Sequence, residues 1–290
     1  MSELSRRSFF GTALAGAMMP AVLGAAETEP PAPKLFRNPY VYRFMIGEPL
    51  EQLPLYVNVL VVRSGKEVAI FDAGFGFNKN PQMGWMEQGL AMAGITPEQV
   101  TIAFLSHGHS DHIGGFVKAG KPTFSNAELH LLPEEVAFWR SPEPDFSKSK
   151  RDPKPLPGMV RDVRAAFDAL GTLLKPVQPG TEFWGGKIVI EAAPGHTSGH
   201  ACFRIRSGNE ELLHLVDLAH HSLLMFANPE WTINFDHDPV VAVVTRKKYW
   251  AEAAAKHTRC YGFHLPWPGL GHIVGTGPTY QWWPERSMWG

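Results

Sequence analysis

Cysteine is scarce in this 290-residue chain, which has Cys202 and Cys260 and no Cys-x-x-Cys pair. A zinc site built from thiolates is therefore not supported. Each cysteine lies in an apolar stretch that is typical of a β-strand. We predict two free, buried thiols, with one disulfide between them as the alternative in an oxidising compartment.

A basic excess is missing too, because 27 Lys and Arg residues face 28 Asp and Glu residues and the formal net charge is -1. Proteins that bind nucleic acid neutralise phosphates with clustered cations, so we expect no nucleic-acid partner. We expect no membrane surface as a partner for the same reason. The chain after residue 26 also lacks an apolar run long enough to span a bilayer. The expected partner is a small-molecule substrate, and a homodimer is left open.

The first 26 residues have the pattern of an export signal. Arg6 and Arg7 precede Phe9, an apolar run rich in Gly and Ala, and the small residues 24–26 that suit a signal peptidase. Paired arginines favour a twin-arginine signal, with an ordinary secretory peptide or a frayed terminus as alternatives. We therefore predict a signal at 1–26, the twin-arginine export machinery as a partner, and a periplasmic or secreted protein. Residues 27–290 are then the folded domain.

The rest of the chain alternates short strands with helices. Runs of β-branched and aromatic residues predict strands at 40–45, 55–62, 68–71, 101–105, 128–132, 187–192, 201–205, 211–216 and 257–263, with two more within 272–283. Caps and apolar periodicity predict helices at 82–93, from 96, and at 133–139, 159–170 and 238–255. Residues 141–158, rich in Pro, Ser, Lys and Asp, are predicted to form a loop or lid. Two mixed sheets between helices fit this order.

The most informative segment is His107-Gly108-His109-Ser110-Asp111-His112, which follows a buried strand. Imidazole and carboxylate groups suit zinc and similar divalent ions. We expect a tight loop to turn these side chains toward one point, with Gly108 and the pair Gly114-Gly115 supplying backbone freedom. Four ligands so close together cannot all serve one tetrahedral ion with an open position, so the sequence predicts a pair of ions.

The remaining ligands must come from distant parts of the chain. Three residues at strand ends or turns are candidates, where loops commonly carry function. They are His196 in Pro194-Gly195-His196-Thr197, Asp217 in Leu215-Val216-Asp217, and His264 in Gly262-Phe263-His264.

These motifs resemble the metallo-β-lactamase superfamily, and within it the methyl parathion hydrolase and lactonase branch. The resemblance covers nearly the whole chain after residue 26 and includes the turn Asp72-Ala73-Gly74 and the closing segment 263–272. It implies an α+β fold, a four-layer αβ/βα sandwich of two mixed sheets flanked by helices. It also implies two divalent ions, normally Zn²⁺, with His107, His109 and His196 on the first, Asp111, His112 and His264 on the second, and Asp217 bridging both.

The resemblance further implies a hydrolase in which two ions activate a shared water, so that a bridging hydroxide attacks the substrate. Asp111 is the candidate to orient that hydroxide or to move its proton. His220 stands where acyl-homoserine lactonases carry a tyrosine that contacts the substrate carbonyl, which puts that particular substrate in doubt. We predict that His220 donates a hydrogen bond or a proton, with a pocket-wall role as the alternative.

Other residues have weaker assignments. His200 and His272 are candidates to support the ligands through hydrogen bonds, with plain packing as the alternative. A set of large apolar residues is a candidate pocket lining, with core packing as the alternative: Phe138, Trp139, Leu223, Phe226 and Trp267. Asp236, Asp238 and Arg246 are predicted to form a structural cap and ion pair.

Two hydrolytic functions are considered first, namely cleavage of a lactone or carboxylic ester and, as the alternative, cleavage of a phosphotriester. Esters and lactones are preferred because natural phosphotriesters are scarce. β-Lactamase activity ranks lower because Asp217 stands where zinc β-lactamases use other ligands. A mono-iron sulfur dioxygenase ranks lower because His112 and His264 would be idle. A non-catalytic binding protein should have lost ligands, and none of the seven is missing.

Overall fold

The structure is a computed structural model that describes residues 41–45, 52–76 and 83–285. One compact unit spans Arg37–Gly290. The described residues all belong to this unit. The predicted export signal at 1–26 therefore lies outside them, and both the signal and the localisation stay predictions.

One sheet has five strands in the order β3-β4-β5-β8-β9. Its strands are β3 (Leu60–Ser64), β4 (Glu67–Phe71), β5 (Ile102–Phe104), β8 (Glu128–Leu131) and β9 (Leu174–Pro176). The first pair is antiparallel and the other pairs are parallel. Parallel strands buried on both faces read as continuous apolar runs, as Ile102–Phe104 does.

The second sheet has seven strands in sequence order, β10 to β16. They are β10 (Glu182–Phe183), β11 (Ile188–Ala192), β12 (Ala201–Ser207), β13 (Glu210–Val216), β14 (Arg259–Gly262), β15 (Leu270–Val274) and β16 (Gln281–Pro284). The pair β13–β14 is parallel and the others are antiparallel. Two further hairpins pair β1 (Val41–Met45) with β2 (Gln52–Tyr56) and β6 (Val117–Lys118) with β7 (Lys121–Pro122).

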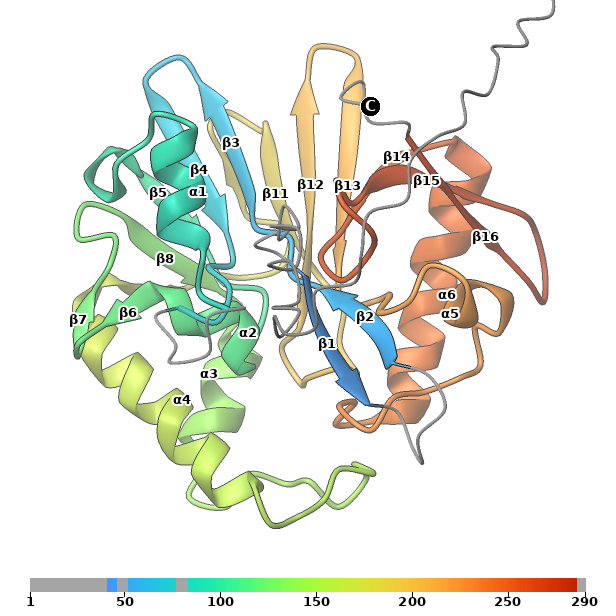
Figure 1. Ribbon diagram of the computed structural model, residues 1–290, viewed down its shortest axis with the longest axis horizontal. Coiled ribbons are helices and arrows are strands. Elements are labelled where there is room, and N and C mark those ends of the chain that lie inside the picture. Colours follow the sequence, from blue (N-terminus) through green and yellow to red (C-terminus); the bar gives the residue numbers. More distant parts are fainter. Residues whose placement is uncertain (1–40, 46–51, 77–82, 286–290) are drawn as a thin grey trace, which may run out of the picture. The chain divides into compact units, whose positions relative to one another are not determined.

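Helices cover the outer faces of both large sheets (Figure 1). The α-helices are α1 (Met86–Met92), α2 (Ser110–Ile113), α3 (Pro133–Arg140), α4 (Leu156–Leu170), α5 (Leu224–Ala227) and α6 (Pro239–Lys256). Three single 3-10 turns are η1 (Pro97–Gln99), η2 (Gly114–Phe116) and η3 (Gly171–Leu173).

Three apolar cores separate the layers. Between the sheets, Phe71 and Phe104 stack at 4.9 Å and meet Phe203 from the other sheet. On the outer face of the five-stranded sheet, α4 buries Val163 and Phe167. On the outer face of the seven-stranded sheet, α5 and α6 bury side chains of a third core. The predicted order of helix, sheet, sheet and helix is confirmed.

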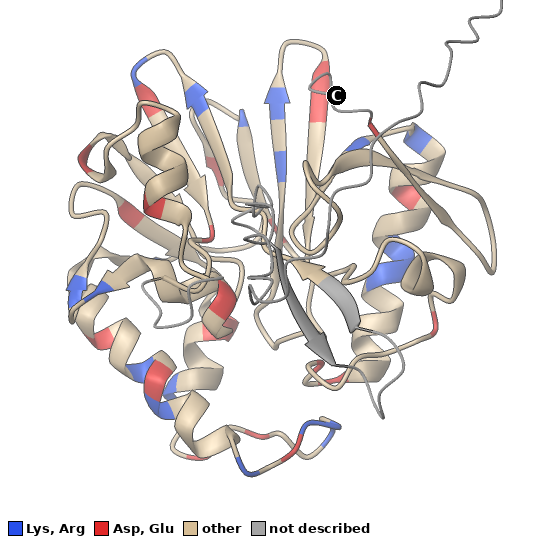
Figure 2. Ribbon diagram, viewed as in Figure 1, with Lys and Arg blue, Asp and Glu red and all other residues tan. Residues whose placement is uncertain are grey.

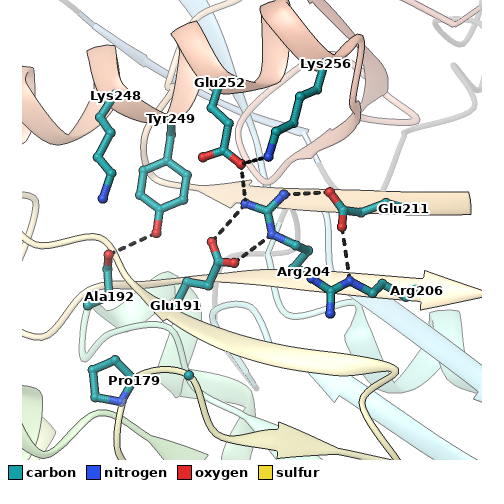
Figure 3. A pocket seen from close by; sticks show the side chains of 11 residues that line it. Pro179, Glu191, Ala192, Arg204, Arg206, Glu211, Lys248, Tyr249, Glu252 and Lys256 are labelled. Carbon is teal, nitrogen blue, oxygen red and sulfur yellow. Dashed lines mark hydrogen bonds and ion pairs between the residues drawn. The ribbon is translucent and has the colours of Figure 1, made fainter.

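An ion-pair network joins α6 to the seven-stranded sheet (Figure 3). The guanidinium of Arg204 donates hydrogen bonds to Glu191 on β11, Glu211 on β13 and Glu252 on α6. The hydroxyl of Tyr249 donates to the carbonyl of Ala192 at 3.0 Å. Arg204 is nearly buried, so these charge-assisted bonds are little screened by water and hold α6 in register with the sheet.

Most predicted elements are found within a few residues of their expected ends, but the strand predicted at 55–62 is wrong as a single element. The chain leaves β2 after Tyr56 and starts β3 at Leu60. Asn58 between them is buried, and its side-chain amide donates to the carbonyls of Gly262 and Leu265. The run is therefore broken by a polar residue that binds the loop around His264.

The predicted state of the two cysteines agrees with the structure. Cys202 and Cys260 are buried and free, as predicted. Basic and acidic residues are interspersed over the ribbon (Figure 2). Within residues 41–45, 52–76 and 83–285, no helix is long and apolar enough to cross a membrane.

Candidate metal centre

The motif 107–112 begins where β5 ends and runs into a short helix. His109 is the residue before α2, and Asp111 and His112 lie in its first turn. The prediction of a loop throughout the motif is therefore wrong for its second half. Because successive helical residues point about 100° apart, Asp111 and His112 approach their common neighbours from two sides.

The glycines of this region act through close packing rather than through unusual backbone angles. Gly114 has ordinary helical angles, with φ -57. A Cβ on Gly108 would lie 2.5 Å from Nε1 of Trp139, and one on Gly115 would lie 2.0 Å from the carbonyl oxygen of Ala73. The predicted backbone freedom is thus the wrong reason for these glycines, which instead let neighbouring segments approach.

A first group brings together His107, His109, His196 and Asp217, all of them buried. Nδ1 of His109 lies 2.9 Å from Nε2 of His107 and 2.9 Å from Nε2 of His196. Oδ2 of Asp217 lies 3.1 Å from Nε2 of His196. These ligand atoms lie within 4.8 Å of one another, as the ligands of one ion must.

A second group contains Asp111, His112 and His264. Nε2 of His264 lies 3.4 Å from Oδ2 of Asp111. Asp217 adjoins this group as well, because its Oδ1 lies 3.2 Å from Nε2 of His112 and its Oδ2 lies 3.3 Å from Nε2 of His264. All seven residues predicted as ligands are therefore brought together, with Asp217 between the two groups.

The position of Asp217 depends on an unusual backbone turn at the end of β13. Val216 has φ 49, in the left-handed region that β-branched residues rarely adopt. The backbone N–H of Asp217 donates to Nε2 of His200 at 3.2 Å. His200 therefore supports Asp217 through its backbone, which agrees with the supporting role predicted for it.

The histidines of the centre are oriented by hydrogen bonds on their far sides. Nδ1 of His112 lies 2.8 Å from Oδ2 of Asp72, and Nδ1 of His196 lies 2.9 Å from Oδ1 of Asp236. Nδ1 of His264 lies 2.6 Å from the carbonyl oxygen of Tyr56. Such contacts fix the tautomer that leaves Nε2 free to bind a metal.

His107 is fixed in the same way through a short relay. Its Nδ1 lies 2.9 Å from the hydroxyl of Ser106, which itself donates to Asp72 at 2.7 Å. Sequence reasoning missed Ser106 and the roles of Asp72 and Asp236. Asp72 stands in a recognised turn motif, whereas a lone Asp236 carries no local signal.

The residues of the centre fit divalent metal ions. Nε2 of His112 and Oδ1 of Asp217 are buried and 3.2 Å apart, and neither makes a hydrogen bond of good geometry with a described residue. Leaving buried polar atoms unpaired costs about 1–3 kcal/mol each. A cation between the atoms would satisfy both, and imidazole with carboxylate is a donor set that zinc-like ions accept.

The histidines of the centre fall into two groups, those with a lowered pKa and those with a raised pKa. Burial lowers the pKa of His107 and His109 well below the usual value, so both are neutral. Burial acts in the same direction on His196, but Asp217 and Asp236 outweigh it and raise the pKa of His196 to about 9. Asp217, together with Asp111 and Asp72, likewise holds the pKa of His112 well above its usual value against the effect of burial.

His220 lies at the edge of both groups. Its Nε2 is 3.1 Å from Oδ2 of Asp217, and its ring stacks on that of His264 with centroids 5.0 Å apart. Burial lowers the pKa of His220 to about 4, so the ring is neutral near pH 7. Asp217, His220 and His264 also satisfy the distance criterion for a metal-binding group, which the sequence had not predicted.

His272 lies elsewhere in the structure. It is on β15 with a half-exposed side chain, and its Nε2 lies 3.7 Å from Glu285. The supporting role predicted for His272 is therefore wrong. Asp238 is the predicted cap of α6, since its side chain accepts from the backbone N–H of Val241. Nη2 of Arg246 lies 4.0 Å from Asp236, which is the predicted ion pair.

A cavity of about 120 Å³ opens beside the ligands. Five of the seven candidate ligands line it, namely His109, Asp111, His196, Asp217 and His264, together with Ser110, Arg151, His220 and four apolar residues, Leu55, Phe75, Met159 and Phe235. The candidate lining residues from the sequence do not line this cavity. Trp139 and Phe226 are buried in the cores, whereas Leu223 and Trp267 are more than half exposed.

The fold and this cluster define a metal-dependent hydrolase, and comparison with known proteins names its family. The sequence profile of the metallo-β-lactamase superfamily matches residues 53–249. The chain therefore belongs to the metallo-β-lactamase superfamily. A comparison with curated protein sequences finds no match.

Solved structures give more specific likenesses. The dizinc quorum-quenching lactonase AidC, solved with a product, N-hexanoyl-L-homoserine, is 32% identical with a TM-score of 0.79, and the match covers 82% of each chain. The hydrolase AbOPH is 28% identical with a TM-score of 0.74, covering 81% of each chain. A probable metal-dependent hydrolase from Staphylococcus aureus shares the fold at 17% identity and a TM-score of 0.64, covering 82% of this chain and 84% of that chain.

Proposed function

We propose that this protein hydrolyses a lactone or carboxylic ester of a small molecule with two bound divalent cations, of which Zn²⁺ is the first candidate. The observation that carries the proposal is the position of Asp217, whose carboxylate adjoins both ligand groups beside one small cavity. The likeness to a dizinc lactonase at 32% identity supports the choice of substrate class.

The proposed ligands follow the geometry of the two groups. His107, His109 and His196 would hold one cation, Asp111, His112 and His264 would hold the other, and Asp217 would contact both. When bound, such a pair of cations supplies an activated water and polarises the oxygen of the bond to be cleaved.

The chain's own residues then position and move protons. Asp111 lies on the cavity wall with its side chain 15% exposed, so its carboxylate can accept a proton from the attacking water and pass it to the leaving oxygen. His220 is neutral and donates from Nε2 to Asp217, which keeps that carboxylate turned toward both groups. The buried walls exclude bulk water and strengthen these interactions.

A substrate panel tests the proposal against its alternative. Signal-free, metal-loaded protein is assayed on a γ-lactone, an aryl carboxylic ester and an aryl phosphotriester. We expect kcat/KM to be highest on the lactone or the carboxylic ester. A phosphotriester rate above both would reverse the order and assign the alternative activity, and turnover of a β-lactam alone would reject both.

A further inference from the structure

The lid segment before α4 is fastened to the chain that carries Asp236. The Nζ of Lys148 donates to Asp238 at 2.6 Å, and the hydroxyl of Ser149 donates to the carbonyl of Asp236 at 2.9 Å. The Nζ of Lys150 donates to the hydroxyl of Thr232 at 3.3 Å. Three successive side chains thus hold this part of the lid against residues 232–238, beside the metal ligands.

Arg151 follows these anchors and reaches the cavity wall. Its guanidinium carbon lies 4.9 Å from the centre of the Phe235 ring, and its Nη1 points to the sulfur of Met159. Its backbone N–H donates to Ser149. A cation–π contact on one face and a thioether at one nitrogen fix the plane of the guanidinium. Its other N–H groups donate to no acceptor among the described residues.

The charge of Arg151 is not neutralised by a direct partner. Among residues 41–45, 52–76 and 83–285, no carboxylate lies within ion-pair distance of its guanidinium, although Asp111 and Asp236 act on it from further away. Burial lowers the pKa of Arg151, which indicates that the cation is partly removed from water. A partly desolvated guanidinium with free N–H groups is stabilised by an oxygen acceptor.

We propose that Arg151 is a specificity-determining residue that donates a hydrogen bond to a neutral carbonyl oxygen next to the bond being cleaved, such as the amide oxygen of an N-acylamino lactone. This inference rests on the proposed function. The cavity lining includes the apolar side chains of Leu55, Phe75 and Phe235, which favour a substrate with an acyl chain and a single hydrogen-bond acceptor. Asp111 lies on the same wall, and its carboxylate disfavours binding of a substrate that carries a carboxylate there.

The test compares two lactones of equal length, one with an acylamino side chain and one with the amide replaced by methylenes. We expect the wild-type protein to have a higher kcat/KM on the acylamino lactone than on the other lactone. Arg151→Met should lower kcat/KM about 10- to 100-fold on the acylamino lactone alone, which removes the preference. Arg151→Lys should retain part of the preference. Arg161→Met, a matched change at an exposed arginine on α4, should leave both substrates unchanged.

A binding measurement separates this inference from the proposed function. The ring-opened N-acylamino acid and its alkyl counterpart are titrated calorimetrically into metal-free and metal-loaded protein. Arg151→Met should weaken binding of the acylamino compound about tenfold or more and spare the other. Equal losses on both compounds, or no loss, would overturn the role of Arg151.

A third lactone, which carries a carboxylate, tests the kind of acceptor. If the wild-type protein prefers this lactone and Arg151→Met loses that preference, the proposal that Arg151 binds a neutral carbonyl oxygen is rejected. If neither lactone is hydrolysed, lactone cleavage is removed from the proposed function and this titration alone decides the role of Arg151.

Discussion

The Oε1 atom of Glu135 accepts a hydrogen bond from the backbone N–H of Gly108 at 2.8 Å. Its other oxygen accepts from the hydroxyl of Thr197 at 2.6 Å and from the backbone N–H of Gly199 at 2.9 Å. One buried carboxylate therefore connects the segment that carries His107 and His109 with the segment that carries His196. Burial raises the pKa of Glu135 even though its hydrogen bonds act in the opposite direction.

Replacing this carboxylate by an amide should loosen both segments. In Glu135→Gln, one carboxylate oxygen becomes an NH₂ group that cannot accept hydrogen bonds. Depending on which oxygen is replaced, the donors left without an acceptor are those of Thr197 and Gly199, or those of Gly108 and Trp139. An unsatisfied buried donor costs about 1–3 kcal/mol, so we expect the free energy of unfolding to fall by about 2–5 kcal/mol. Urea denaturation measures this loss. Glu134→Gln, at the exposed neighbouring position of α3, is the control, and an equal effect there would remove the special role of Glu135.

The contact between Asp236 and His196 predicts an effect on metal affinity without loss of a ligand. Burial would raise the pKa of Asp236, but the hydrogen bond from His196 outweighs it and lowers that pKa. Asp236→Asn should weaken metal binding about 10- to 100-fold, because the imidazole loses its charged partner. Competition with a chromogenic chelator measures the affinity. Asp238→Asn is the control, since Asn caps a helix as well as Asp does, and it should bind metal normally. Unchanged metal affinity in Asp236→Asn would refute the role of Asp236 in orienting His196.

Metal binding should release protons near neutral pH. His112 and His196 are protonated at pH 7 in the metal-free chain, since the pKa of His196 is about 9 and that of His112 is well above its usual value. An imidazole must lose its proton before it binds a metal. We expect release of about two protons on loading at pH 7, and an apparent affinity that rises with pH up to about 9. Calorimetric Zn²⁺ titrations in buffers of different ionisation enthalpy measure this release, and a pH-independent affinity would contradict it.

Acid should destabilise the metal-free protein through histidines that are buried in neutral form. His214 packs between the sheets against Phe71 and Phe203, and burial lowers its pKa to about 4. Between about pH 6.5 and 4 the unfolded chain binds a proton there and the folded chain does not, so stability falls as pH falls, by about 1.4 kcal/mol per pH unit for each such proton. His214→Leu should reduce that slope by about one proton in urea unfolding from pH 7.5 to 5. The half-exposed His272→Gln is the control, and an unchanged slope in His214→Leu would reject the assignment.

The seven candidate ligands, which the structure brings together, could be picked out from the sequence because their chemistry is concentrated. Three imidazoles and a carboxylate within six residues have few structural explanations, and the distant partners stand at the ends of apolar strands. The elements were predictable for a related reason, since strands and helices such as 211–216 and 238–255 carry local periodicity and caps, whereas the order of the layers was implied by the family resemblance.

Residues whose role depends on packing between distant segments could not be predicted. Glu135 is one of several acidic residues on an amphipathic helix, and only the approach of Gly108 and Gly199 gives it a role. Arg151 lies in a charged loop that has no periodicity. The split of 55–62 has the same origin, because Asn58 meets carbonyls more than 200 positions away in sequence.

The most direct test of the metal centre is anomalous X-ray diffraction from metal-loaded crystals, combined with elemental analysis of the same protein. We expect two anomalous peaks per chain, one beside His107, His109 and His196 and one beside Asp111, His112 and His264, with the Asp217 carboxylate between them. A single iron peak per chain, or two peaks that do not flank Asp217, would contradict it.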